Sequence, residues 1–127
     1  MNQDLVLILD LGGEDNSRVV RAVRALGVYS EVRAHNITKK ELLEIKNLKG
    51  IILNGGKNRI VEGKTIFEKR YIHTIGVPVL SIEHSSPYCN PDIGKLPKKD
   101  SELLALLEPF LFEKCKAQPN WNMKNFV

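Results

Sequence analysis

The sequence predicts an α/β fold in which a parallel sheet is doubly wound by helices. Short apolar runs at 5–9, 50–53 and 78–82 are typical of strands buried on both faces of a sheet. Segments with helical spacing of apolar residues separate these runs, and the connections are short. Strands that alternate with helices in this way form parallel sheets joined by right-handed crossovers.

The first strand and helix are predicted from the N-terminal third of the chain. The run Leu5–Leu9 forms the strand, and Asp10–Gly13 forms a turn. A helix then begins near the candidate caps at 15–17 and ends at Gly27, a residue favoured just beyond a helix. Its apolar positions are Val19, Val20, Val23 and Leu26, and its outward positions are Arg18, Arg21 and Arg24.

Three further strands follow. Residues 29–34 alternate like a strand, and Thr38 with Glu41 forms a capping-box pattern that opens a helix reaching Leu48. The third strand, 50–53, ends at Asn54-Gly55-Gly56, and a helix is expected around 65–73. The fourth strand is 78–82, with a proline at its start, where a missing N–H is tolerated. We expect the strand order 2-1-3-4 in a three-layer α/β/α, flavodoxin-like arrangement.

The remainder of the chain is less regular. Residues 82–100 contain three of the six prolines and read as an irregular loop. Apolar residues from Leu103 to Leu111 indicate a helix, with a kink or break between Leu107 and Pro109. We expect one domain over 1–127, with 118–127 as an exit segment.

Composition excludes several classes of protein. The net charge of +4 is spread over interleaved basic and acidic residues, which does not favour nucleic-acid binding. No apolar run has the length of a membrane span, and the N-terminus does not resemble a secretory signal. Cys89 and Cys115 form neither a CxxC pair nor a disulfide framework, so we expect a reduced, cytoplasmic protein without metal or cofactor.

Ligands of doubly wound sheets bind beyond the carboxyl ends of the strands. Three segments are predicted to reach that edge: 10–16, 54–58 and 83–86. Gly12 and Gly13 precede a helix start and could hold an anion on backbone N–H groups, or form only a tight turn. Lys57 is a further candidate for anion binding, with a solvated loop as the alternative.

Several segments together resemble the class I glutamine amidotransferase domain of the GMP synthetase type. They occur in the family's order and cover about 4–82 and 103–127: Gly27–Val32, Lys49–Gly56, Gly76–Leu80, Phe110–Cys115 and Asn120–Phe126. The resemblance implies glutamine hydrolysis for purine nucleotide biosynthesis. In the family a cysteine in a Gly-Xaa-Cys-Xaa-Gly elbow attacks glutamine, a His-Xaa-Glu pair supplies the base, and a Gly-Gly loop stabilises the oxyanion.

This chain departs from that pattern at the nucleophile. Aligned on the fourth strand, Glu83 stands where the cysteine belongs, and serines replace both flanking glycines. No His-Xaa-Glu occurs, and the half of the domain that carries it is missing between about Pro87 and Ser101. Of the family's catalytic elements, only the oxyanion loop, Asn54, Gly55 and Gly56, is intact. The Cys-His-Glu triad is therefore absent.

Two classes of function stay open. The first is a pseudoenzyme that acts as a binding, regulatory or interaction module, with a synthetase (ATP pyrophosphatase) subunit or a second copy of itself as partner. The second is an enzyme: a residual GMP synthetase component, or a repurposed hydrolase that uses Glu83 or Cys89. The competing interpretation of those two residues is a relic turn and an ordinary loop thiol.

Overall fold

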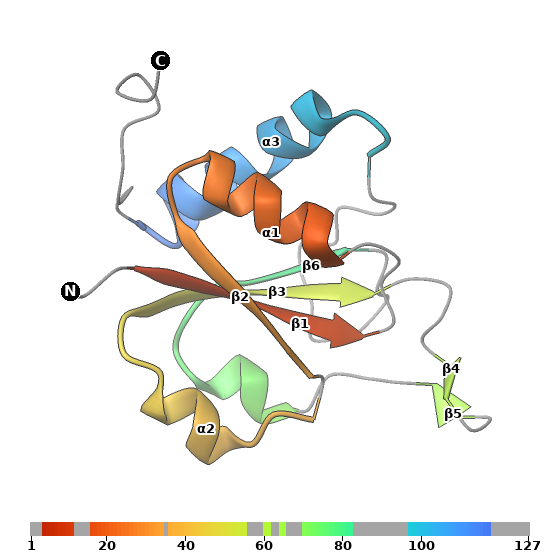
Figure 1. The fold of residues 1–127 in the computed structure, drawn as a ribbon. Coiled ribbons are helices and arrows are strands. Elements are labelled where there is room, and N and C mark those ends of the chain that lie inside the picture. Colours follow the sequence, from red (N-terminus) through yellow and green to blue (C-terminus); the bar gives the residue numbers. More distant parts are fainter. Residues whose placement is uncertain are drawn as a thin grey trace.

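The computed structural model of the protein describes residues 4–11, 16–34, 36–55, 60–61, 64–65, 70–82 and 97–117. Four strands form one parallel sheet in the order β2-β1-β3-β6 (Figure 1). Since β6 is the fourth strand of that sheet along the chain, the predicted order 2-1-3-4 is confirmed. The strands are β1 (Leu5–Leu11), β2 (Tyr29–Ala34), β3 (Leu48–Gly55) and β6 (Val79–Ile82).

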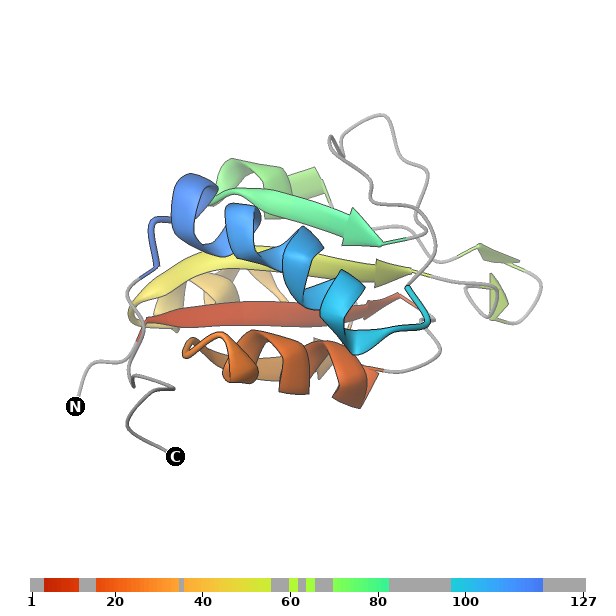
Figure 2. The same ribbon diagram turned by 90° about the horizontal axis from the view of Figure 1, so that it is seen from above.

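Helices cover both faces of the sheet, as predicted. One face is covered by α1 (Asn16–Ala25) and α3 (Asp100–Pro109), which lie against each other. Figure 2 shows both helices running along that face. The opposite face is covered by α2 (Lys39–Glu44) and the 3₁₀ helix η1 (Arg70–Thr74) (Figure 1).

The sheet separates two apolar cores because successive strand side chains point to opposite faces. Val6 and Ile8 of β1 pack under α1 and α3. Leu7, Leu9 and Leu11 of the same strand pack under α2 and η1. Burial on both faces explains why the strand is a continuous apolar run rather than an alternating one.

Strand β1 is longer than predicted. Asp10 and Leu11 belong to the strand and not to a turn, and Leu11 is fully buried in the core beneath α2. Strand β3 is also longer than predicted, starting at Leu48 and including Asn54 and Gly55.

The predicted capping box is confirmed, but the helix that it opens is short. Thr38 Oγ1 accepts a hydrogen bond from the Glu41 N–H, and the Glu41 carboxylate accepts one from the Thr38 N–H. The helix ends at Glu44 instead of reaching Leu48. Asn47 has a φ of 64°, the left-handed conformation that asparagine tolerates better than most residues, and the chain turns there into β3.

The predicted helix over 65–73 is wrong in its first part. Thr65 belongs to β5 (Lys64–Thr65), which pairs antiparallel with β4 (Ile60–Val61). Three of these four residues are β-branched, which favours extended backbone over helix. Only η1 is helical in the described part of this region, and Ile72 fixes it to the core.

Of the kink or break predicted between Leu107 and Pro109, the break is wrong. Helix α3 continues through Pro109 and then widens into a π-helical turn, η2 (Phe110–Lys114), in which the Cys115 N–H donates to the Phe110 carbonyl. Pro109 cannot donate to the carbonyl four residues earlier, so placement at the helix end limits the loss. Phe110 and Leu111 of the wider turn are both buried.

Helices of the described part are too short or too polar to cross a membrane. Most of the predicted loop 82–100 and the whole predicted exit segment 118–127 lie outside the described residues.

Candidate functional site: the carboxyl edge of the sheet

Three strands bring their ends to one edge, where the sequence predicted a ligand site. Asp10 of β1 lies in register with Asn54 of β3, and Asn54 lies in register with Ile82 of β6. The parallel pairing thus aligns the strand residues that directly precede Gly12, Gly56 and Glu83 in the sequence. Of the predicted segments, the described residues Asp10, Leu11, Asn54 and Gly55 lie at this edge, whereas all of 83–86 lies outside the described residues.

Asn54 has a buried polar side chain at this edge. It is 1% exposed, and its Nδ2 donates to Oδ1 of Asn16, 2.7 Å away. Asn16 is the first residue of α1, so this hydrogen bond ties the end of β3 to the start of the helix that follows β1. A buried amide without such a partner would cost about 1–3 kcal/mol. The hydrogen bond to Asn16 therefore compensates for the burial of the Asn54 amide.

Gly55 is the last residue of β3, buried and in register with Leu11. The other candidate residues from the sequence, Gly12, Gly13, Gly56, Lys57, Glu83 and Cys89, lie outside the described residues, as do His35 and His84. Glu83 follows the last residue of β6 directly in the sequence. The site roles of these residues stay predictions.

Cys115 lies at the opposite edge of the sheet. It packs against Gly50, which pairs with Val6 near the start of β1, four residues before the edge formed by Asp10 and Asn54. The thiol is buried with no disulfide partner, and burial raises its pKa to about 12. A neutral thiol is a poor nucleophile. Cys115 is therefore neither placed nor ionised to act as a nucleophile at the carboxyl edge of the sheet.

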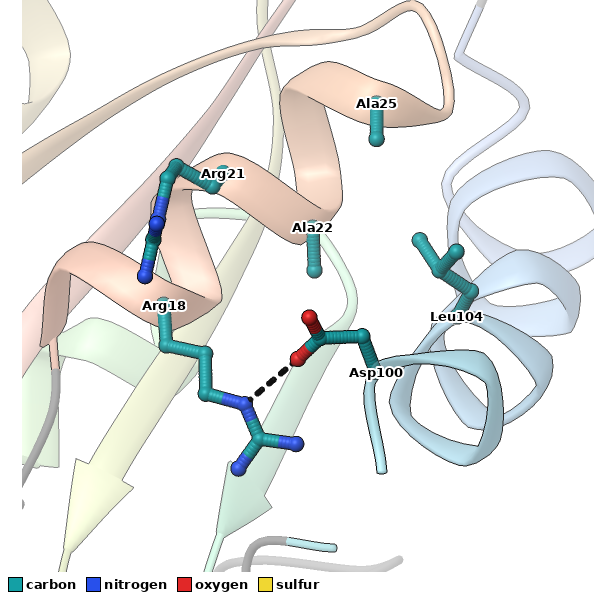
Figure 3. A pocket seen from close by; sticks show the side chains of 6 residues that line it. All are labelled: Arg18, Arg21, Ala22, Ala25, Asp100 and Leu104. Carbon is teal, nitrogen blue, oxygen red and sulfur yellow. Dashed lines mark hydrogen bonds and ion pairs between the residues drawn. The ribbon is translucent and has the colours of Figure 1, made fainter. Parts of the chain in front are cut away.

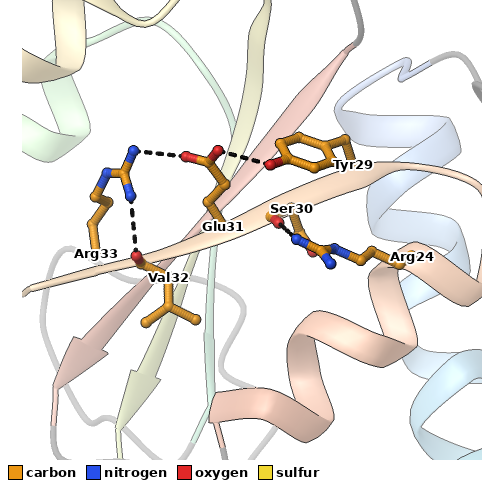
Figure 4. A network of polar contacts seen from close by, with 6 residues as sticks. All are labelled: Arg24, Tyr29, Ser30, Glu31, Val32 and Arg33. Carbon is orange, nitrogen blue, oxygen red and sulfur yellow. Dashed lines mark hydrogen bonds and ion pairs between the residues drawn. The ribbon is translucent and has the colours of Figure 1, made fainter.

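A polar network runs along the outer strand β2 (Figure 4). The Tyr29 hydroxyl donates to Glu31 over 2.9 Å, and the Arg33 guanidinium pairs with the other oxygen of that carboxylate at 2.7 Å. The hydrogen bond from Tyr29 to the Glu31 carboxylate, together with the negative charge of Glu31, raises the pKa of Tyr29. Arg24 stacks over the Tyr29 ring and donates to the Ser30 carbonyl.

We interpret this network as protection of the outer strand β2 and not as a reaction centre. Its charged side chains lie along a strand that has no neighbour on one side among the described residues. Charges on an edge strand oppose pairing with another chain.

Sequence reasoning missed a pocket between α1 and α3 (Figure 3). It has a volume of about 240 Å³ and is lined by Arg18, Arg21, Ala22, Ala25, Asp100 and Leu104. Arg18 Nε pairs with the Asp100 carboxylate at 2.8 Å, linking the first turns of the two helices. The sequence placed these arginines on the outer face of α1, and nothing in it indicated that α3 would dock beside them.

The described residues hold no cluster of three or more His, Cys, Asp or Glu side chains suited to a metal ion. Comparison with family models finds no match to the chain. Comparison with curated proteins finds clear relatives. The chain is 42% identical over all its 127 residues to a putative second GMP synthase, of the glutamine-hydrolysing kind, from Bacteroides thetaiotaomicron.

The chain is similar to part of the glutamine-hydrolysing GMP synthases. Over 80 and 81 residues it is 41% identical to the GMP synthases of Staphylococcus saprophyticus and Oceanobacillus iheyensis. These matches cover 63% and 64% of the chain. The chain spans only 29% of the Bacteroides relative, and its matches span 15% and 16% of the other two.

These shares also indicate how long the relatives are. If 127 residues are 29% of the Bacteroides relative, that protein has about 440 residues. By the same reasoning the other two GMP synthases have about 500 to 530 residues. The relative that matches along the whole chain is therefore tens of residues shorter than those that match only in part.

Proposed function

We propose that this chain is a glutamine amidotransferase-like domain of the GMP synthase type that does not hydrolyse glutamine and works as an interaction module. The observation that carries the proposal is the position of Cys115. It is the one cysteine in the described part of the chain, and it is buried and protonated near the amino ends of the strands, opposite to the end at which β6 leads into Glu83.

The residue after β6 supports the same proposal. By the resemblance along the fourth strand, Glu83 stands where the family has its cysteine. Attack by a carboxylate on the amide of glutamine would form an anhydride, and the chain has no His-Xaa-Glu to supply a base for its hydrolysis. The oxyanion loop alone cannot replace a nucleophile and a base.

The lengths of the relatives support a shortened domain that works beside a synthetase part. The Bacteroides relative contains a counterpart of all 127 residues and about 310 residues more. Its shorter total length fits a protein in which the same half of the amidotransferase domain is missing. We therefore propose the synthetase part of a GMP synthase as partner, in the reduced cytoplasm.

The alternative of a residual GMP synthase component is favoured by the same whole-chain match. In that case the domain positions or stabilises the synthetase part, which receives ammonia from another source. A repurposed hydrolase using Glu83 or Cys89 has no described geometry in its favour.

Ammonia release from glutamine tests the loss of hydrolysis. The purified chain is assayed beside the full-length GMP synthase of Staphylococcus saprophyticus as a positive control. We expect no release above the background of buffer, and no change with Cys89→Ser or Cys115→Ala. Release that disappears after thiol alkylation would contradict the proposal.

A further inference from the structure

The volume of the pocket between α1 and α3 limits the size of the ligand that it can bind. Small-molecule and cofactor pockets usually have volumes of about 300–1,000 Å³. At about 240 Å³ this pocket is smaller, and it lies between two helices instead of at the carboxyl edge of the sheet. A cavity of this size takes one or two protein side chains more readily than a nucleotide.

The wall of the pocket is apolar at one end. Ala22 and Ala25 of α1 face Leu104 of α3 across the gap (Figure 3). Alanines at these positions leave space where larger residues would have closed the contact between the helices. This end fits an aliphatic side chain.

The other end carries the charge. The ten residues of α1 include three arginines and no acidic residue. Arg24 contacts Tyr29 and the Ser30 carbonyl, and Arg18 pairs with Asp100. Arg21 is exposed at the rim of the pocket, and none of the described residues forms an ion pair or hydrogen bond with it. The two arginines and one aspartate of the lining leave a net positive charge.

We propose that this pocket docks a segment of the synthetase part that carries a carboxylate beside an aliphatic side chain. The carboxylate pairs with Arg21, and the aliphatic side chain enters between Ala22, Ala25 and Leu104. This proposal rests on the proposed function and names the surface through which the partner binds. In the Bacteroides relative the counterpart of this chain and the remaining polypeptide are one molecule, which supplies a high effective concentration for such a contact.

The test measures binding of the 127-residue chain to the part of the Bacteroides relative that lies outside the match, prepared as a separate polypeptide. Arg21→Glu reverses the charge at the rim, and Ala25→Leu fills the pocket without changing charge. Lys40→Glu makes the same charge reversal at an exposed position of α2, on the other face of the sheet, and serves as the matched control. Thermal unfolding of each variant, and of the separate polypeptide, verifies that it is folded before binding is measured.

We expect Arg21→Glu and Ala25→Leu each to weaken binding at least about tenfold, and Lys40→Glu to stay within about twofold of the parent chain. Raising the salt concentration should weaken the parent complex, because the contact includes an exposed ion pair. Equal binding by all three variants would overturn the pocket as docking site and leave the proposed function standing. Failure of the parent chain itself to bind would overturn both.

Discussion

Gly50 and Cys115 are in such close contact that no side chain fits on Gly50. A Cβ at this position would overlap the Cys115 sulfur and would lie 3.4 Å from the Phe110 ring. The contact joins the start of β3 to the end of η2, and so fixes the C-terminal helix on the sheet. It also explains why the family-like segment before Asn54 contains a glycine within a buried strand.

Gly50→Ala should therefore destabilise the protein by about 1–3 kcal/mol, because the added methyl overpacks a closed core. Cys115→Ala removes the overlapping sulfur, so the double variant should lose less stability than the sum of the two single changes. Denaturant unfolding of the four proteins measures this coupling. Strict additivity would show that the two residues are not in contact.

Cys115 should resist alkylation in the folded protein. Burial keeps its thiol protonated up to a pKa of about 12, and only the thiolate reacts readily. In a Cys89→Ser background, which leaves Cys115 as the sole thiol, iodoacetamide at pH 8 should modify the chain only after denaturant is added. Rapid modification of the native chain would contradict the burial and reopen a catalytic role for this residue.

Glu83→Cys should not restore glutamine hydrolysis. The substitution supplies a thiol at the family's nucleophile position, but the His-Xaa-Glu base remains absent, and triad members act as a unit. Ammonia release by this variant should equal that of the parent chain. A clear gain would show that another group serves as base.

The Tyr29 network should respond to alkaline pH. The pKa of Tyr29 is raised in the folded state by Glu31, so the stabilisation by this contact is complete below about pH 10 and is lost as Tyr29 ionises above it. Ring NMR signals of Tyr29 should titrate at lower pH in Glu31→Gln than in the parent. An unchanged midpoint would exclude Glu31 as the cause.

The protein should dimerise through β6 in light scattering at low micromolar concentration. Among the described residues β2 and β6 are the outer strands, and the edge of β2 is protected by Glu31, Arg33 and Arg24. Strand β6 carries no charged residue. Val79→Lys should yield monomers, whereas Val32→Lys on the other edge should not. A parent chain that is strictly monomeric would contradict this expectation.

The sequence by itself determined the class of the fold and its strand order. Strands buried on both faces leave continuous apolar runs, and the Thr38–Glu41 cap and Gly27, with its φ of 91°, mark helix ends through local chemistry. These signals depend on neighbours a few residues away, so they can be read along the chain. The placement of Glu83 at the family's nucleophile position, on which the proposed loss of hydrolysis rests, also came from the sequence.

Only the tertiary structure decided where a strand forms in place of a predicted helix, and which residues distant in the sequence come into contact. Leu48 follows a helical pattern but joins β3, because pairing with β1 and burial against the core outweigh a weak local preference. The Asn54–Asn16 hydrogen bond, the Gly50–Cys115 contact and the Arg18–Asp100 pair each join residues 38 to 82 positions apart. No local pattern encodes such contacts, since each arises only when two elements that are distant in the sequence pack together in the folded domain.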